Sequence, residues 1–417
     1  MLRSYPFPGK RGMPAFYTLF LLALLMLSRD TLFSRNLLGF GKSQLLTVGI
    51  IALLALIFLF FHRKQLKAVL KDLRLPTAAA AAILILLPMV FKRDWQFTYV
   101  SIVIYIFICV FLSYFLTLQQ VSRYYLVIMT VLGAYSVLCT YGLRILPDRG
   151  ILNVPVFANS QGVEFYNFGL AQVSLEFVKI RNFGIFREPG VYQFFLLIGL
   201  YLNNYRANWE KNWQVWVING ILAFTMLTTF ATGGIIEMGL LAIFLFVDKK
   251  WYRSRTAKIL AALLAALLGC AVAWILITKN SLYQDLVFMV IKFAHPEYAG
   301  SHFEPLGVDL QIFLKHPILG DTVYNVLHAL PSNATSTMVM YAFLGFLGGS
   351  FHVLCWAALS WDRDKGIIRN LFLMLILFMS FNTQNLSTNL FFWLFPILAL
   401  CERGLPLLAK KNRTKGE

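Results

Sequence analysis

The chain has 417 residues, of which 59% are hydrophobic and only 13% are charged, so lipid must form part of its solvent. A formal net charge of +18 would suit nucleic acid, but the sequence has no zinc-ligand pattern and no RNA-binding aromatic motif. The basic residues instead stand in short clusters between apolar runs, which indicates membrane topology and excludes a nucleic-acid partner.

Apolar runs long enough to cross about 30 Å of hydrocarbon predict about twelve transmembrane helices. No small-residue cleavage site follows the first run, so we interpret it as a retained helix and not as a signal peptide. In chain order the predicted spans are residues 13–27, 45–61, 77–91, 99–117, 126–143, 191–202, 213–230, 234–247, 259–277, 336–356, 371–381 and 390–400. The expected fold class is an all-α polytopic membrane protein with a single integral membrane domain over residues 1–417.

The distribution of Lys and Arg predicts the orientation, because these residues resist translocation when they lie in short loops. Most of the 37 fall on one side of the predicted spans, with dense clusters at residues 63–74 and 249–258. We therefore expect cytoplasmic N- and C-termini, and outward-facing loops at residues 144–190 and 278–335. Long loops in compact proteins usually carry function.

Each outward loop has its own pattern. In the first, Val173, Leu175 and Phe177 alternate with polar residues, which suits a short strand or a surface segment. In the second, residues 282–293 and 308–314 show apolar periodicity, which predicts two amphipathic helices on the membrane surface.

The end of the first outward loop carries the densest charge. Pro189 fits the first turn of a helix, so Glu188 would lie at the helix entrance, beside Arg181 and Arg187. The unpaired N–H groups of that helix and the two arginines would form a cradle for a lipid-linked diphosphate. The alternative is that these are solvated loop charges, with Arg187 and Glu188 paired locally.

The second outward loop holds Lys315, His316 and His328. Histidine suits deprotonation of a hydroxyl group near neutral pH, although a histidine followed by proline is often only a turn element.

Glu237 lies inside the eighth predicted span, and an intramembrane carboxylate is a functional candidate by default. The alternative interpretation is that Glu237 has no functional role and either stays hydrated near the membrane surface or forms a hydrogen bond to a neighbouring helix.

Two motifs carry a resemblance to a known family. They are R-x-x-G-x-F-x-E-P, which begins at Arg181 and ends at Pro189, and F-x-x-H-P-I-L-G, which begins at Phe313 and ends at Gly320. With these motifs and two long outer loops, the chain resembles the bacterial superfamily of O-antigen and capsule polymerases (the Wzy class) and O-antigen ligases.

The resemblance implies a membrane glycosyltransferase that uses an undecaprenyl-diphosphate-linked oligosaccharide and needs no metal and no cofactor. The residues expected to bind the diphosphate are Arg181, Arg187, Lys315 and His316. The candidates for the catalytic base or the acceptor-orienting group are Glu188, His328 and Glu237.

The leading interpretation is a polymerase that joins repeat units into O-antigen, capsular or exopolysaccharide. It would be a multi-pass protein of the bacterial inner membrane with an outward-facing active site, and its partners would be membrane lipids, a chain-length regulator and a flippase. The alternatives are an O-antigen ligase that uses a lipid A core, and a transporter or flippase of lipid-linked sugars. Residues 231–234 read Ala-Thr-Gly-Gly where ligases commonly carry a Ser-Arg-Gly turn, which favours the polymerase.

Overall fold

The computed structural model describes residues 13–31, 34, 44–61, 73–158, 163–175, 181–253, 255, 277, 296–329, 335–362 and 364–404, which are mostly helical. The long helices are α1 (Met13–Met26), α2 (Gln44–Phe61), α4 (Arg74–Phe91), α5 (Phe97–Phe115), α6 (Leu118–Leu138), α8 (Pro189–Tyr205), α9 (Asn212–Thr228), α10 (Thr232–Asp248), α13 (Pro296–Lys315), α15 (Thr337–Ser360), α16 (Ile367–Phe381) and α17 (Leu390–Ala399). Short elements are η4 (Cys139–Leu143), α7 (Ile145–Asp148), η5 (Trp251–Arg253), α14 (Val323–Ala329) and η6 (Leu400–Gly404).

Four of the described helices are long and apolar enough to cross a membrane. They are α4, α5, the continuous helical run from Leu118 to Asp148, and α15, and three shorter apolar helices accompany them. These helices give the chain the character of a membrane protein. The predicted span at residues 259–277, apart from Ile277, and the predicted amphipathic helix at 282–293 lie outside the described residues.

Helices α8 and α17 form the centre of the bundle. All ten residues of α17 are buried, and α8 is buried from Val191 to Asn203. The surrounding helices expose large apolar side chains on their outer faces, such as Leu56 (61%), Ile243 (64%) and Leu354 (62%). Apolar side chains both inside and outside a bundle are typical of helices that face lipid.

Local sequence signals explain where several helices begin. Thr117 and Gln120 form a capping box at the start of α6. Pro189 occupies the first turn of α8, where its missing N–H costs nothing. The Asn389 side chain accepts a hydrogen bond from the N–H of Phe391 and so caps α17.

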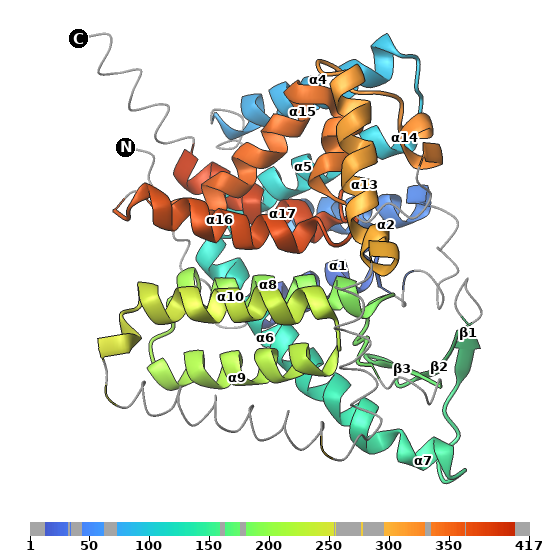
Figure 1. Cartoon of the computed structure of the whole chain (residues 1–417), viewed down its shortest axis with the longest axis vertical. Helices are drawn as coiled ribbons and strands as arrows, with labels where there is room; N and C mark the ends of the chain where they lie inside the picture. The colour runs from blue at the N-terminus through green and yellow to red at the C-terminus, as the bar shows by residue number, and fades with distance from the viewer. Residues whose placement is uncertain are drawn as a thin grey trace.

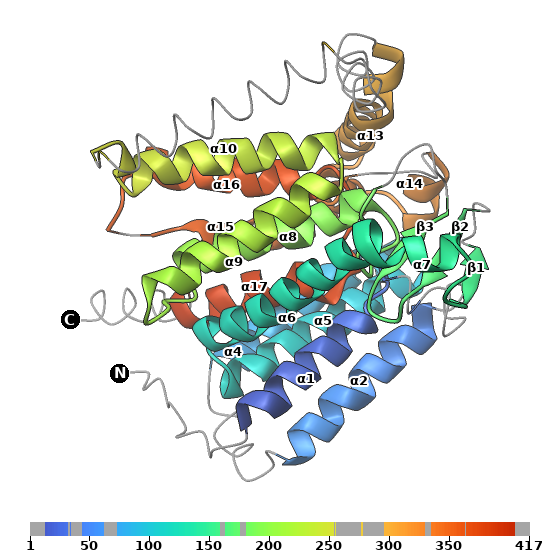
Figure 2. The ribbon, with the colours of Figure 1, turned by 90° about the horizontal axis from the view of Figure 1, so that it is seen from below.

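The connections between helices gather at the two ends of the bundle. At one end, the α1–α2 connection contacts the α8 entrance and the α16–α17 loop, as shown by the contacts of Asp30 with Arg187 and Asn389. At the other end, Arg369 pairs with Asp248. Figures 1 and 2 show that α7, α13, α14 and the strands lie at the first end. Helices α8, α9 and α10 therefore run in alternating directions, and so do α15, α16 and α17.

The first long loop contains a small sheet, which departs from the all-α expectation. Strands β1 (Val156–Ala158), β2 (Glu164–Asn167) and β3 (Gln172–Ser174) pair antiparallel in the order β1-β2-β3. Opposite residues include Phe157 with Phe165, and Tyr166 with Val173. The strand β3 includes Val173 of the alternating stretch, but all three of its residues are buried, so neither of its faces meets solvent.

Candidate functional site

A pocket of about 350 Å³ opens where the α1–α2 connection, the α8 entrance, α14, α15 and the α16–α17 loop meet. Its polar lining consists of Arg29, Asp30, Gln96, Thr98, Arg187, Asn385, Ser387 and Thr388. Its apolar lining consists of Val323, Val326, Leu327, Val339 and Phe343. A pocket that is lined both by two arginines and by aliphatic and aromatic side chains suits an amphiphile with an anionic head.

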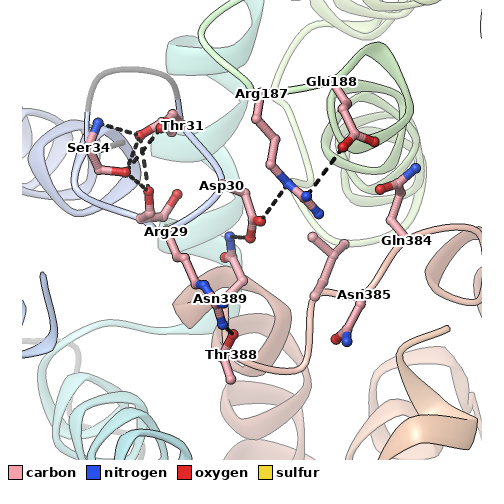
Figure 3. Close-up of polar contacts among 12 residues, drawn as sticks. Arg29, Asp30, Thr31, Ser34, Arg187, Glu188, Gln384, Asn385, Thr388 and Asn389 are labelled. Carbon is pink, nitrogen blue, oxygen red and sulfur yellow. Dashed lines mark hydrogen bonds and ion pairs between the residues drawn. The ribbon is translucent and has the colours of Figure 1, made fainter. Parts of the chain in front are cut away.

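Arg187 is held in the pocket by Asp30. The Nε of Arg187 lies 3.1 Å from Oδ1 of Asp30, and the backbone N–H of Arg187 donates to the carbonyl oxygen of Asp30 at 2.9 Å. Nδ2 of Asn389 donates to the other carboxylate oxygen of Asp30 at 2.7 Å (Figure 3). Because Asp30 is buried and fixed from two sides, it orients the guanidinium of Arg187 in advance of any ligand.

Arg29, which precedes Asp30 in the turn after α1, supplies a second cation to the pocket. Its NH1 donates to Oγ1 of Thr388 at 2.6 Å, and the arginine as a whole is exposed (Figure 3). The hydroxyl of Thr31 donates to the carbonyl oxygen of Met26 at 2.6 Å, which fixes the turn that carries Arg29 and Asp30. Two arginines therefore line one pocket although they lie far apart in the sequence.

Glu188 lies beside Arg187 and does not itself line the pocket. Its Oε1 is 3.3 Å from NH1 of Arg187, and its side chain retains 43% exposure. It precedes Pro189 at the start of α8 and makes no side-chain cap to that helix. The local pairing of Arg187 with Glu188 was the alternative drawn from the sequence; in the structure it coexists with the Asp30 contact.

The α16–α17 loop completes the site with neutral polar groups. Gln384 packs against the entrance of α8 so closely that a Cβ on Gly190 would lie 2.5 Å from its Nε2. Asn385 lines the pocket next to Ser387 and Thr388 (Figure 3). Amides and hydroxyls beside two cations are groups that bind sugar hydroxyls or a phosphate by hydrogen bonds.

Three of the other predicted residues surround this region without lining the pocket. His328 is exposed at the end of α14, with its ring 4.1 Å from that of Tyr324, and its neighbour Leu327 lines the pocket. Lys315 and His316 are exposed at the end of α13, and Nε2 of His316 is 3.9 Å from Oδ2 of Asp321. Their roles stay predictions.

Arg181 and Glu237 lie elsewhere. Nε and NH2 of Arg181 donate to the carbonyls of Thr229 and Phe230 at 3.0 and 3.3 Å, which caps the C-terminal end of α9. Glu237 is buried on α10, with Oε1 at 3.9 Å from the position of a Cβ on Gly233. Neither side chain lines the arginine pocket, and the structure leaves their predicted roles untested.

The His-Pro-Ile-Leu-Gly segment fits into a break in α15. Gly345 has φ 66° and ψ −166°, and the helix there is interrupted. The segment bonds to the freed backbone: Phe346 N–H donates to the Pro317 carbonyl at 2.7 Å, and Asp321 N–H donates to the Ala342 carbonyl at 2.6 Å. Non-helical backbone inside a spanning helix is tolerated where protein groups satisfy it. This docking positions α14 and α15, which supply the apolar wall.

Sequence reasoning missed Arg29, Asp30 and the α16–α17 loop. Two signals were available: a charged pair immediately after the first apolar run, and the uninterrupted polar run Asn382-Thr383-Gln384-Asn385 between two apolar spans. Within the described ranges, no group of three His, Cys, Asp or Glu side chains converges as metal ligands. Independence from metals stays a prediction.

No protein-family model matches this chain, and neither a curated protein nor a solved structure matches it. The site is therefore interpreted from its own chemistry.

Proposed function

We propose that the chain polymerises lipid-linked oligosaccharide repeat units at the outer face of the bacterial cytoplasmic membrane. The donor is an undecaprenyl-diphosphate-linked saccharide, and a hydroxyl of the acceptor attacks its anomeric carbon. The bond between that carbon and the diphosphate oxygen breaks, the diphosphate leaves with the electron pair, and the hydroxyl proton passes to a base. The observation that carries the proposal is the pocket that Arg29 and Arg187 line together with apolar side chains of α14 and α15.

Each part of the pocket has a task in this reaction. The guanidinium of Arg187, oriented by Asp30, stabilises the charge that develops on the leaving diphosphate. The apolar wall of α14 and α15 accommodates the first part of the polyprenyl chain. Glu188 is the best placed of the predicted bases, because it lies beside Arg187 and keeps solvent contact.

The proposal includes a topology of about twelve spans with the arginine pocket facing outward. The density of basic residues at the opposite end of the bundle supports this orientation. The resemblance in the Arg181–Pro189 and Phe313–Gly320 motifs supports the same family of reactions.

Synthetic undecaprenyl-diphosphate-linked repeat units, added to the purified chain in nanodiscs, test the proposal. Wild-type protein should yield elongated product on the lipid carrier, also in the presence of a chelator. Arg187→Ala should slow elongation by about 10²–10³, the usual cost of losing one donor to a developing oxyanion, and Arg187→Lys should recover only part. Protein recovery and thermal stability serve as controls for folding.

Three outcomes separate the alternatives. Saccharide found only on an added lipid A core acceptor would identify a ligase. Donor that crosses the bilayer without a new covalent product would identify a transporter. Full elongation by Arg187→Ala, at normal protein recovery, would show that the arginine pocket does not bind the diphosphate.

A further inference from the structure

A second pocket, also of about 350 Å³, lies at the opposite end of α8 from the arginine pocket. It is formed where α8 ends, α9 begins and α10 ends, and Figure 2 shows these three helices side by side. Its lining is unlike that of the first pocket: four asparagines, three tryptophans, one valine and one lysine, with no carboxylate.

A network of amides holds the walls of this pocket. Nδ2 of Asn203 donates to Oδ1 of Asn219 at 2.8 Å and to the carbonyl of Val215 at 2.9 Å. The indole N–H of Trp209 donates to Oδ1 of Asn203 at 2.6 Å. Asn204 and Asn219 exchange hydrogen bonds at 3.0 and 3.2 Å. These bonds fix α8 against α9 and hold the pocket open without a ligand.

Lys249 brings a positive charge to the pocket without a carboxylate of its own. Its Nζ donates to the carbonyl of Asn204 at 3.3 Å and lies 5.0 Å from the ring centre of Tyr205. The neighbouring carboxylate, that of Asp248, accepts hydrogen bonds from Nε and NH2 of Arg369 at 2.7 and 3.1 Å. No ion pair joins Lys249 to any carboxylate in the described part of the chain. Burial lowers the pKa of Lys249, against the opposing effect of Asp248. Lys249 is exposed, so its ammonium can meet an anion that enters the pocket from outside.

Further donors and ring surfaces point at the same space. The side chains of Asn208 and Asn212 are exposed and have no hydrogen-bond partner among the described residues. Trp216 and Trp251 pack against each other with ring centroids 4.8 Å apart. The pocket thus offers one ammonium, two free amides and indole surfaces at a helix end.

We propose that this pocket binds the phosphate head group of an anionic phospholipid from the leaflet at that end of the bundle. The ammonium of Lys249 and the amide N–H groups of Asn208 and Asn212 would bind the phosphate oxygens, and the indoles would contact the glycerol. Tryptophans are enriched at the boundary between membrane and water, and basic pockets among helix ends suit anionic head groups.

The surface next to the pocket indicates that the ligand is a lipid and not a soluble phosphate compound. Trp213 (60% exposed) and Val217 (47%) on α9, and Val247 (58%) on α10, present apolar side chains beside the pocket. Acyl chains of a lipid whose head group fills the pocket would lie along these side chains. In the orientation proposed above this is the cytoplasmic leaflet.

The test is a titration of the full-length chain, purified and delipidated in a neutral detergent, with dihexanoylphosphatidylglycerol. We expect a saturable change of tryptophan fluorescence and a rise of the melting temperature. Dihexanoylphosphatidylcholine, glycerol 3-phosphate and inorganic phosphate should bind at least about tenfold more weakly, because they lack either the net charge or the apolar part. Lys249→Gln should weaken phosphatidylglycerol binding about tenfold or more, as expected for a lost hydrogen bond to a charged group.

Lys250→Gln is the matched control, since Lys250 is exposed at the same helix end and does not line the pocket. It should bind phosphatidylglycerol as the wild type does. If Lys249→Gln is recovered poorly, Asn212→Ala replaces it and should weaken binding severalfold. Equal binding of the phosphatidylglycerol and phosphatidylcholine probes would overturn the proposal. So would full binding of inorganic phosphate alone, or equal weakening by the Lys249 and Lys250 variants.

Discussion

Asp30 and Arg187 are expected to act as one unit in catalysis. The carboxylate of Asp30 holds Nε of Arg187 at 3.1 Å and is itself held by Asn389. Asp30→Ala should therefore slow transfer by about 10²-fold, because a displaced guanidinium no longer meets the leaving diphosphate. In the Arg187→Ala background the same change should have little further effect, since the group that Asp30 orients is already gone.

The measurement is a double-mutant cycle, in which the rate of elongation is determined for the wild type, for Asp30→Ala, for Arg187→Ala and for the double variant. Asp148→Ala is the control, because it removes an aspartate paired with Arg144 at 3.3 Å on the same end of the bundle, outside the arginine pocket. Independent, multiplicative effects of the Asp30 and Arg187 changes would contradict the orienting role of Asp30.

The sequence identified one arginine of the pocket and missed the other for a physical reason. Arg187 stands in a charged, Gly- and Pro-containing segment, which is a local signal. Arg29 becomes a pocket residue only through its contact with Thr388, and no local pattern encodes a contact across 359 positions. Arg181 stands in the same charged segment as Arg187 and gives the same local signal. In the structure, however, its N–H groups cap α9 and do not line the pocket.

Among the elements, the break in α15 depends on two glycines that face each other. A Cβ on Gly345 would lie 2.2 Å from the carbonyl oxygen of Ile318, and a Cβ on Gly320 would lie 2.5 Å from the carbonyl carbon of Phe343. Both glycines also have positive φ, which alone costs other residues about 1–3 kcal/mol. Gly345→Ala and Gly320→Ala should each reduce the amount of folded protein in the membrane severalfold.

Membrane abundance and the melting temperature in detergent measure this effect. Gly220→Ala is the control, since a Cβ there meets nothing within 4 Å and the residue lies inside α9, where alanine is favoured by about 1 kcal/mol. Normal abundance and stability of both Gly345→Ala and Gly320→Ala would refute the close backbone crossing.

Helix positions were largely predictable, whereas the way the elements interlock was not. The predicted spans at 13–27 and 45–61 agree with α1 and α2 within a few residues, because hydropathy and length are properties of a short window. The predicted helix at 308–314 is the end of α13, whose earlier part contains Pro305 and weakens the periodicity. The break at Gly345 was missed since it exists only where residues 317–321 dock.

For the molecule as a whole, the two ends of the bundle should lie on opposite sides of the membrane. Arg149 and Lys365 are exposed at opposite ends, the first before the sheet and the second in the α15–α16 connection. In intact spheroplasts an impermeant maleimide should label Arg149→Cys and leave Lys365→Cys unlabelled, because short basic loops stay in the cytoplasm. Permeabilised cells should label both.

The two variants are matched, since each replaces one exposed basic residue, and the unmodified chain gives the background. Cys109, Cys139, Cys355 and Cys401, the cysteines among the described residues, are buried, so they should add little to the signal of an added exposed thiol. Labelling of Lys365→Cys alone in intact spheroplasts would invert the orientation and place the arginine pocket on the cytoplasmic side.

The hydrogen bonds that join Asn389 to Asp30, and Arg29 to Thr388, have a consequence for biosynthesis. The turn that carries Arg29 and Asp30 leaves the ribosome early, whereas its partners Thr388 and Asn389 belong to the loop between α16 and α17. Until α16 and α17 have entered the membrane, the aspartate and both guanidiniums have only part of their final surroundings. A nascent chain therefore cannot hold the finished arginine pocket before α17 has been made, so under the proposed function it would not bind a lipid-linked sugar during synthesis.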